Sequence, residues 1–288
     1  MRHLYFLMLL SFAIFAGSEA AVGRSPEVKI MTFNIRFDNP ADGVNSWSHR
    51  KLHAANCISF YEADIVGLQE ALLHQLTDLT SYLPDYAYLG LGRDDGKEKG
   101  EFSAILYKRD RFEVLKSATF WLSEQPEKPG KKGWDAACPR VVTWALLKDK
   151  ISGKELYIFN THFDHVGKEA RRESSKMLLS EVKKIAQDKN AVITGDFNAT
   201  VDEEVIAILT DTKNPDKFVD SRQIAGLRYG PDYTWHNFGR DNSGRIIDFI
   251  FVKGKGIKVK KSGILVEKPE NEVYLSDHNP VLCVLNIE

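Results

Sequence analysis

Short runs of apolar residues recur along the chain and predict a protein of the α/β class. Runs that alternate with polar residues, or that are short and bounded by Gly, Pro, Asn or Asp, are expected to be strands. The predicted strands span residues 28–35, 64–68, 86–91, 102–107, 112–122, 141–147, 156–163, 191–195, 246–252, 257–266 and 281–287. Apolar residues at helical spacing predict helices over residues 46–61, 71–82 and 169–187.

The segments between these elements are short and polar. Charged residues and glycines occupy 93–100, and prolines and lysines occupy 123–133, so both segments are expected to be exposed loops. Neither is long enough to be an interdomain linker. We therefore expect a single domain over residues 27–288.

The first residues have the pattern of a secretory signal peptide. A short basic start precedes an almost wholly apolar stretch at 4–16, and small residues follow at 17–21. The stretch is too short to span a membrane comfortably. We therefore expect a signal peptide over residues 1–20 and export to the periplasm or the extracellular space. No second long apolar run follows, so we expect no stable membrane insertion. We also expect the protein to be a monomer.

Composition narrows the class of protein further. The chain has 39 Lys and Arg against 40 Asp and Glu, and 43% of its residues are hydrophobic, which excludes a disordered chain. A formal charge of −1 disfavours an unselective binder of polyanions, which would carry a basic excess. This charge is compatible with an enzyme that binds phosphate through a metal ion.

The three cysteines do not form a recognisable metal or disulfide pattern. Cys57, Cys138 and Cys283 lack CxxC spacing, which argues against a thiolate zinc site. Cys57 and Cys283 lie among apolar residues and are expected in the core. Export would permit a disulfide, but the spacing does not assign one.

Chemistry-bearing residues gather where predicted strands end. Five apolar segments change abruptly to Asn, Asp, Glu or His, at Asn34, at Gln69-Glu70, at 160–165, at 196–198 and at 276–280. Each alone is compatible with an ordinary turn. Their occurrence together in one chain is difficult to explain as turns alone.

Asp248 differs from these residues because it lies inside a predicted apolar strand. A buried carboxylate costs several kcal/mol unless it is paired. A histidine is the expected partner, because Asp248 would then set the tautomer of the imidazole and stabilise its charged form.

A weak internal repeat suggests how these strand ends meet. Asn34 and Asn160 stand in similar apolar strands, and a second short strand ends in an acid 36 residues beyond each, at Glu70 and at Asp196. Two β–α–β halves that face each other as two sheets would bring both strand ends to one rim.

The residue types predict metal-assisted hydrolysis of a phosphoester. Glu70, Asn34 and Asp277 offer the oxygen ligands that Mg²⁺ or Mn²⁺ prefers. Asp196 could orient or deprotonate a water, with Asn198 holding the water or the phosphate. Two histidines could bind phosphate oxygens or move protons, namely His162 and His278.

This ordered set resembles the motifs of the endonuclease/exonuclease/phosphatase superfamily. That group includes deoxyribonuclease I, abasic-site endonucleases, bacterial sphingomyelinases, inositol polyphosphate 5-phosphatases and deadenylases. The resemblance covers residues 27–288 and rests on Asn34, Gln69-Glu70, Asn160-Thr-His162, Gly195-Asp196-Phe-Asn198, Asp248 and Ser276-Asp277-His278. It implies a four-layer α/β sandwich: two mixed β-sheets face to face, helices outside, and the active site at one rim.

The resemblance also implies a role for each motif. Glu70 is the main metal ligand with Asn34 beside it, and Asp248 supports His278. Asp196 activates or orients the nucleophile with help from Asn198, and His162 contacts the scissile phosphate. Whether Asp196 or His278 is the general base stays open. Abasic-site endonucleases have a tyrosine in place of His162, so abasic-site repair is not expected.

Two alternatives belong to other classes. One is a binding protein that keeps this fold without catalysis, although the complete acid and histidine set favours an enzyme. The other is a metallo-β-lactamase-like zinc hydrolase, because Asn160-x-His162-x-Asp164-His165 is one residue short of the H-x-H-x-D-H signature. That fold would leave the motifs at 195–198 and 276–280 unexplained.

The substrate is predicted only as a class, a phosphate ester from nucleic acid, a phospholipid head group or a sugar phosphate. Trp235 could stack on a base or a sugar, and Arg140 could bind a second phosphate. Asn160 and Asp164 are further candidates for substrate contacts. For Asp164 and His165, a place at the entry of the following helix, before Gly167, is an equal alternative.

Overall fold

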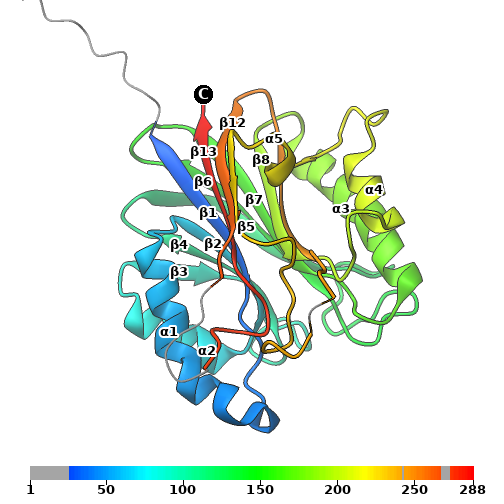
Figure 1. Ribbon diagram of the computed structural model, residues 1–288. Coiled ribbons are helices and arrows are strands. Elements are labelled where there is room, and N and C mark those ends of the chain that lie inside the picture. The colour runs from blue at the N-terminus through cyan, green and yellow to red at the C-terminus, as the bar shows by residue number, and fades with distance from the viewer. Residues whose placement is uncertain (1–25, 242, 267–272) are drawn as a thin grey trace, which may run out of the picture.

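The computed structural model describes residues 26–241, 243–266 and 273–288. The predicted signal peptide over 1–20 lies outside the described residues. Two β-sheets lie face to face, and helices cover their outer faces, α1 and α2 on one side and α3 and α4 on the other (Figure 1). The predicted four-layer α/β sandwich is confirmed.

The first sheet has seven strands and is mixed. β1 runs parallel to β2 and antiparallel to β13, so the two ends of the described chain pair in the middle of this sheet. In spatial order the strands are β10 (Leu227–Tyr229), β12 (Ile257–Ile264), β13 (Val281–Ile287), β1 (Glu27–Asn34), β2 (Ile65–Ala71), β4 (Phe102–Lys108) and β3 (Tyr86–Leu89).

The second sheet has six strands, of which β7 and β8 are parallel. In spatial order they are β5 (Phe112–Trp121), β6 (Val141–Asp149), β7 (Glu155–His162), β8 (Ala191–Asp196), β11 (Asp248–Lys253) and β9 (Val219–Asp220). The helical segments are η1 (Pro40–Asn45, a 3₁₀ helix), α1 (Trp47–Phe60), α2 (Leu73–Tyr82), α3 (Lys168–Ala186), α4 (Glu204–Thr210) and α5 (Ser221–Ile224). None of the helices in the described ranges is long and apolar enough to cross a membrane.

Three apolar clusters correspond to the three interfaces of the sandwich. Side chains of β1 alternate between two of them, because successive residues of a strand point to opposite faces. Ile30 packs in the cluster between the sheets, whereas Phe33 packs against α1 and α2. On β7, Ile158 likewise faces the other sheet and Phe159 faces α3.

All the predicted strands and helices are present, with differences at their ends. The short elements α4, β9, α5 and β10 were not predicted, because they are too short to show a periodic pattern. Asp248 is the first residue of β11 and not an interior one, so the prediction of its place in the strand was wrong by two residues. The three cysteines form no disulfide, and Cys57 and Cys283 are buried as expected.

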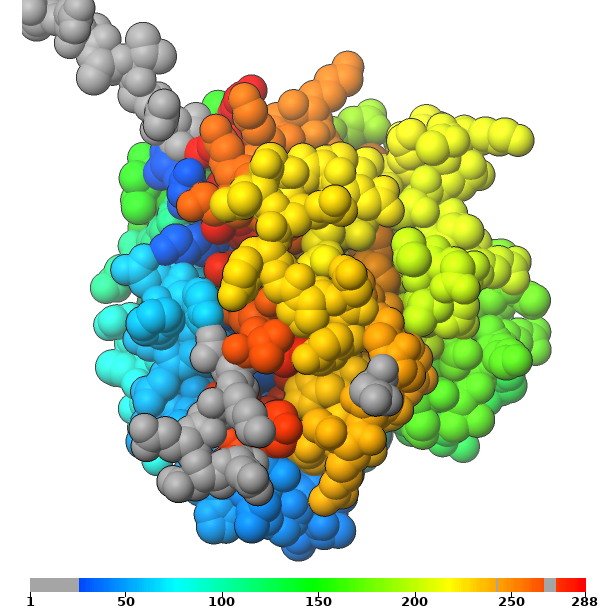
Figure 2. Space-filling view, viewed as in Figure 1, coloured from blue at the N-terminus to red at the C-terminus, as the bar shows by residue number. Residues whose placement is uncertain are grey.

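Strand pairing brings the predicted motifs to one rim. Asn34 at the end of β1 lies beside Gln69 of β2, and His162 at the end of β7 lies beside Asp196 of β8. Asp248 pairs with Asp196 in turn. In Figure 2 the red C-terminal part of the chain is flanked by the blue and cyan N-terminal part and by yellow and orange residues.

Asn160 lies one layer below this rim, so the prediction that it contacts substrate was wrong. β1 ends at Asn34, but β7 continues two residues beyond Asn160 to His162. Asn160 is fully buried; its Nδ2 donates to the carbonyl oxygens of Leu68 and Ala104 at 2.8 and 2.9 Å. Its Oδ1 accepts from Nε2 of Gln69 at 2.7 Å and from Oγ1 of Thr194 at 3.0 Å. Asn160 therefore joins the two sheets.

The sheets approach closely at this point. A Cβ atom on Gly67 of β2 would lie 2.1 Å from Oγ1 of Thr194 and 2.5 Å from Oδ1 of Asn160. Only glycine leaves room for the hydrogen bonds that cross between the sheets.

Replacing Asn160 by Ala is expected to lower the free energy of unfolding by about 3 kcal/mol, because it strands buried polar partners in both sheets. Denaturant unfolding measures this loss. The control is Asn214→Ala, which removes a single hydrogen bond, the one that the backbone nitrogen of Asp216 donates to Oδ1 of Asn214. If Asn160→Ala kept normal stability but lost activity, Asn160 would have to be a substrate contact and not a structural residue.

Candidate active site

A cavity of about 380 Å³ opens at the rim where the two sheets meet. Six of the predicted catalytic and metal-binding residues line it: Glu70, His162, Asp196, Asn198, Asp277 and His278. All six belong to motifs at strand ends or to the turns that follow them. The cavity is of the size that binds a small organic ligand.

Glu70 is held at the end of the first β–α–β unit. It adopts a positive φ of 59°, and its Oε2 accepts from the backbone nitrogen of Phe37 at 3.1 Å. Nδ2 of Asn34 donates to Oε1 of Glu70 at 3.1 Å. Burial opposes ionisation, but the charge of His278 and the bond from Asn34 hold the pKa of Glu70 below its usual value.

Asn34 lies beside Glu70 as predicted, but its amide is turned toward the acids. Its Nδ2 donates to Glu70 and also to Oδ2 of Asp196 at 3.0 Å, while its Oδ1 accepts from the backbone nitrogen of Arg36 at 2.9 Å. In this orientation Asn34 positions two carboxylates, and its oxygen does not face a common ion with them.

Arg36 is a functional residue that the sequence analysis missed. Its Nη1 lies 3.9 Å from Oε2 of Glu70, and its Nε lies 4.0 Å from Oδ2 of Asp277. Both carboxylates therefore lie near the same guanidinium group, and burial together with the charge of Glu70 raises the pKa of Asp277. The two oxygen donors fit Mg²⁺ or Mn²⁺, and Glu70 and Asp277 are the residues that would hold it.

Asp196 and Asn198 form the turn after β8. Oδ1 of Asp196 accepts from the backbone nitrogen of Asn198 at 2.9 Å. Nδ2 of Asn198 donates to Nε2 of His162 at 3.0 Å. Burial and the charge of nearby Asp248 raise the pKa of Asp196 to about 7. Asp196 can therefore accept a proton near neutral pH.

His278 forms the buried acid–histidine pair that the sequence predicted for Asp248. Its Nδ1 donates to Oδ2 of Asp248 at 2.9 Å, and its Nε2 lies 3.8 Å from Oδ2 of Asp196. Burial alone would lower the pKa of His278, but the charge and hydrogen bond of Asp248 raise it to about 10. His278 is therefore a cation that donates hydrogen bonds.

His162 has the opposite charge state. Burial and the positive charges of Arg140 and Arg93 lower the pKa of His162 well below its usual value. Because Asn198 donates to Nε2, the proton of the neutral ring lies on Nδ1. His162 thus brings a neutral ring to the cavity, between the Asn198 amide and these two guanidinium groups.

Asp164 does not line the cavity, which favours its predicted place at the entry to the following helix over a substrate contact. It is buried, and its carboxylate accepts from the backbone nitrogens of Ala137, Val166 and Gly167 at 3.1, 3.0 and 2.7 Å. These bonds outweigh the effect of burial and hold the pKa of Asp164 well below its usual range. Asp164 organises the turn before α3.

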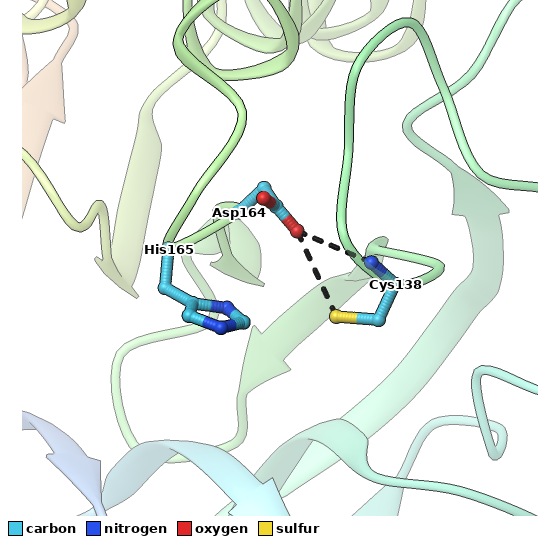
Figure 3. Close-up of side chains that lie close together, drawn as sticks. All are labelled: Cys138, Asp164 and His165. Atoms are coloured by element: carbon cyan, nitrogen blue, oxygen red, sulfur yellow. Dashed lines mark hydrogen bonds between the residues drawn. The ribbon is translucent and has the colours of Figure 1, made fainter.

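Arg140 lines the cavity, as its predicted contact with a phosphate requires, and two neighbours fix its position. Its Nε donates to Oδ2 of Asp164 at 3.4 Å, and its Nη2 donates to Nδ1 of His165 at 2.9 Å. Figure 3 shows Cys138, Asp164 and His165 turned toward one another, with the thiol 3.7 Å from Oδ2 of Asp164. Because a guanidinium cation already bonds this acid and this histidine, the cluster does not suit a metal ion.

The zinc-hydrolase alternative also fails on geometry. Within the described part of the chain, no group of three or more convergent His, Cys, Asp or Glu ligands contains His162. Asp164 and His165 instead converge with Cys138. The residues that resemble the zinc signature therefore lie in different places: Asn160 in the buried layer, His162 at the cavity and Asp164 in the turn before α3.

Trp235 lines the cavity, as its predicted substrate contact requires. The guanidinium of Arg245 lies over its ring, 4.2 Å from the centroid. Arg245 and the pair Arg93 and Glu101 also line the cavity and were missed by sequence reasoning. The only signal for Arg93 and Glu101 was their place near the two ends of a charged, glycine-bearing loop that was expected to be exposed.

Replacing Asp164 by Asn is expected to lower the melting temperature at pH 7. A depressed pKa stabilises the fold above the unfolded value of about 3.9 and loses this effect as the pH falls through the folded value. The difference between wild type and Asp164→Asn should therefore narrow only below about pH 4. Calorimetry from acid to neutral pH measures it, with exposed Glu113→Gln as control. If the difference in melting temperature did not change with pH, the carboxylate of Asp164 would not have a depressed pKa.

Comparisons with known proteins agree with this geometry. A structure of an endonuclease/exonuclease/phosphatase from Bacteroides vulgatus is 45% identical, with a TM-score of 0.87 over 91% of this chain and 100% of its own. A mannosyl-6-phosphatase from Bacteroides thetaiotaomicron is 36% identical, with a TM-score of 0.84 over 90% of this chain and 99% of its own.

More distant relatives share the fold alone. The catalytic domain of human Nocturnin is 21% identical, with a TM-score of 0.71 over 91% of this chain and 94% of its own. Residues 31–278, which include every rim motif described above, match the Endonuclease/Exonuclease/phosphatase family. The chain belongs to this family.

Proposed function

We propose that this protein is an exported, divalent-metal-dependent phosphatase that hydrolyses a sugar phosphate. The observation that carries the proposal is one cavity of about 380 Å³ that combines a metal-binding acid pair, a proton acceptor and cationic donors. Its volume suits a phosphorylated monosaccharide better than a nucleic-acid strand. The likeness to a mannosyl-6-phosphatase supports the same substrate class.

The residues present support the following division of roles. A divalent ion held by Glu70 and Asp277 would supply positive charge to the phosphoryl oxygens. Asp196 orients a water and accepts its proton as the oxygen attacks phosphorus. The bond from phosphorus to the sugar oxygen breaks, and the leaving sugar oxygen takes up a proton from the solvent. His278, charged through Asp248, donates a hydrogen bond to the phosphoryl group. The proposal thus assigns the general base to Asp196.

The amide of Asn198 is a neutral donor that completes the proposed phosphate site, and the neutral ring of His162 holds this amide in place. Nδ2 of Asn198 and the ring of His162 meet at 3.0 Å, beside the Asp196 carboxylate. Because His162 is neutral and its Nε2 accepts from Asn198, it orients this amide without forming an ion pair with Asp196. Export is proposed from the apolar stretch at 4–16 and the small residues at 17–21.

The proposal predicts a metal requirement and a preference for monoesters. Purified protein treated with EDTA should lose its turnover of hexose 6-phosphates, and Mg²⁺ or Mn²⁺ should restore it. Parallel assays use plasmid DNA, RNA, sphingomyelin and inositol phosphates, with released phosphate or product as the readout. Faster hydrolysis of a diester than of any sugar phosphate would contradict the proposed substrate class. Full activity in EDTA would contradict the proposed metal requirement.

Asp196→Asn and His278→Ala should each lower kcat by about 10³-fold or more. The first removes the group that accepts the proton of the water, and the second removes the charged donor to the phosphoryl group. Circular dichroism should show both variants folded. Exposed Glu155→Gln is the control and should keep wild-type turnover. Near-normal activity in both variants would overturn the mechanism and favour a binding protein without catalysis.

A further inference from the structure

A charged pair lies in the wall of the cavity beyond the proposed catalytic groups. Nη1 of Arg93 donates to Oε2 of Glu101 at 2.6 Å, and Nη2 donates to Oε1 at 2.8 Å. The two side chains are 15% and 18% exposed, and both line the cavity that holds Glu70 and His162. A bidentate pair of this kind is rigid and has directed polar atoms.

The backbone around Arg93 is fixed from three directions. Its nitrogen donates to the carbonyl oxygen of Glu101 at 3.1 Å, which closes the loop between β3 and β4. Its carbonyl oxygen accepts from the indole nitrogen of Trp121 at 2.7 Å and from the backbone nitrogen of Gly130 at 3.2 Å. The loop that was expected to be merely exposed therefore places this pair with little freedom.

A recess lies between this pair and the phosphate site. Its volume is about 10 Å³, which is about the room that one oxygen atom of water size needs. Arg93, Glu101, Arg140 and His162 all line it. Arg140 is 5% exposed, and its Nη1 has no hydrogen-bond partner among the described residues. This buried guanidinium can therefore still donate to an oxygen.

The chemistry of the pair separates hydroxyl groups from other ligands. The Glu101 carboxylate repels a phosphate, and the Arg93 guanidinium repels a metal ion. A hydroxyl can donate to the carboxylate and accept from a guanidinium at the same time. Two adjacent hydroxyls on a sugar ring present such donors and acceptors side by side.

We propose that Arg93 and Glu101, together with Nη1 of Arg140, form a subsite that binds hydroxyl groups of the sugar and determines specificity. The inference rests on the proposed sugar phosphatase function. It assigns recognition of the leaving polyol to the loop between β3 and β4, separate from the phosphate site. A sugar phosphate with free ring hydroxyls is the preferred substrate, and a phosphomonoester without hydroxyls is a poor one.

The test compares substrates with and without these hydroxyls. Glu101→Gln and Arg93→Ala should lower kcat/KM for a hexose 6-phosphate by about tenfold to a hundredfold, because buried polar groups lose a partner. Glu101→Gln should change kcat/KM for p-nitrophenyl phosphate by less than about threefold, because this ester has no hydroxyl to recognise. Arg93→Ala is compared on the sugar phosphate alone, because Arg93 also influences the charge of His162. Glu155→Gln, in the exposed ion pair with Lys189, is the matched control.

A substrate series separates recognition from a structural role. With wild-type protein, one or more monodeoxy hexose 6-phosphates should be hydrolysed about tenfold less efficiently, and Glu101→Gln should abolish that difference. The proposed subsite would be wrong if Glu101→Gln lowered kcat/KM equally for the hexose 6-phosphate and for p-nitrophenyl phosphate. It would also be wrong if this variant needed more Mg²⁺ with both substrates. Hydrolysis of p-nitrophenyl phosphate but of no sugar phosphate by the wild-type protein would overturn the proposed function itself.

Discussion

The amide of Asn34 donates hydrogen bonds to two carboxylates that belong to different sheets, Glu70 at 3.1 Å and Asp196 at 3.0 Å. Glu70 lies near the end of β2 in the first sheet, and Asp196 ends β8 in the second. Two buried carboxylates so close together repel each other unless donors and cations surround them. The catalytic arrangement therefore depends on how the sheets are aligned at this rim, and the layer below, centred on Asn160, sets that alignment.

The distribution of charge explains how a nearly neutral chain can address phosphate. The formal charge of −1 conceals an acidic site that would attract a cation. Asp248 keeps His278 charged, while two guanidinium groups help keep His162 neutral. Neighbouring histidines at one rim thus occupy opposite protonation states, and each state follows from the charges that the fold places nearby.

Scaffold and specificity are assigned to different parts of the chain. The rim residues stand at the ends of strands in the middle of both sheets, where alternation and pairing fix their positions. The walls of the cavity come from connecting segments, which supply Arg93, Glu101, Arg140 and Arg245. Members of one family can therefore share a reaction centre and differ in the ester they accept, because loops tolerate change more easily than paired strands.

The sequence by itself determined the strands, the fold class and most of the rim, because apolar alternation and abrupt polar strand ends are local patterns. It predicted that Asp248 would need a histidine, because an unpaired buried carboxylate is too costly. Only the tertiary structure decided that Asn160 joins the sheets. β1 ends at Asn34, whereas β7 continues for two residues after Asn160, so Asn160 lies below the rim. Only the tertiary structure could also bring Arg93 and Glu101 into the cavity, because loop closure and contacts with distant residues have no periodic signature in the sequence.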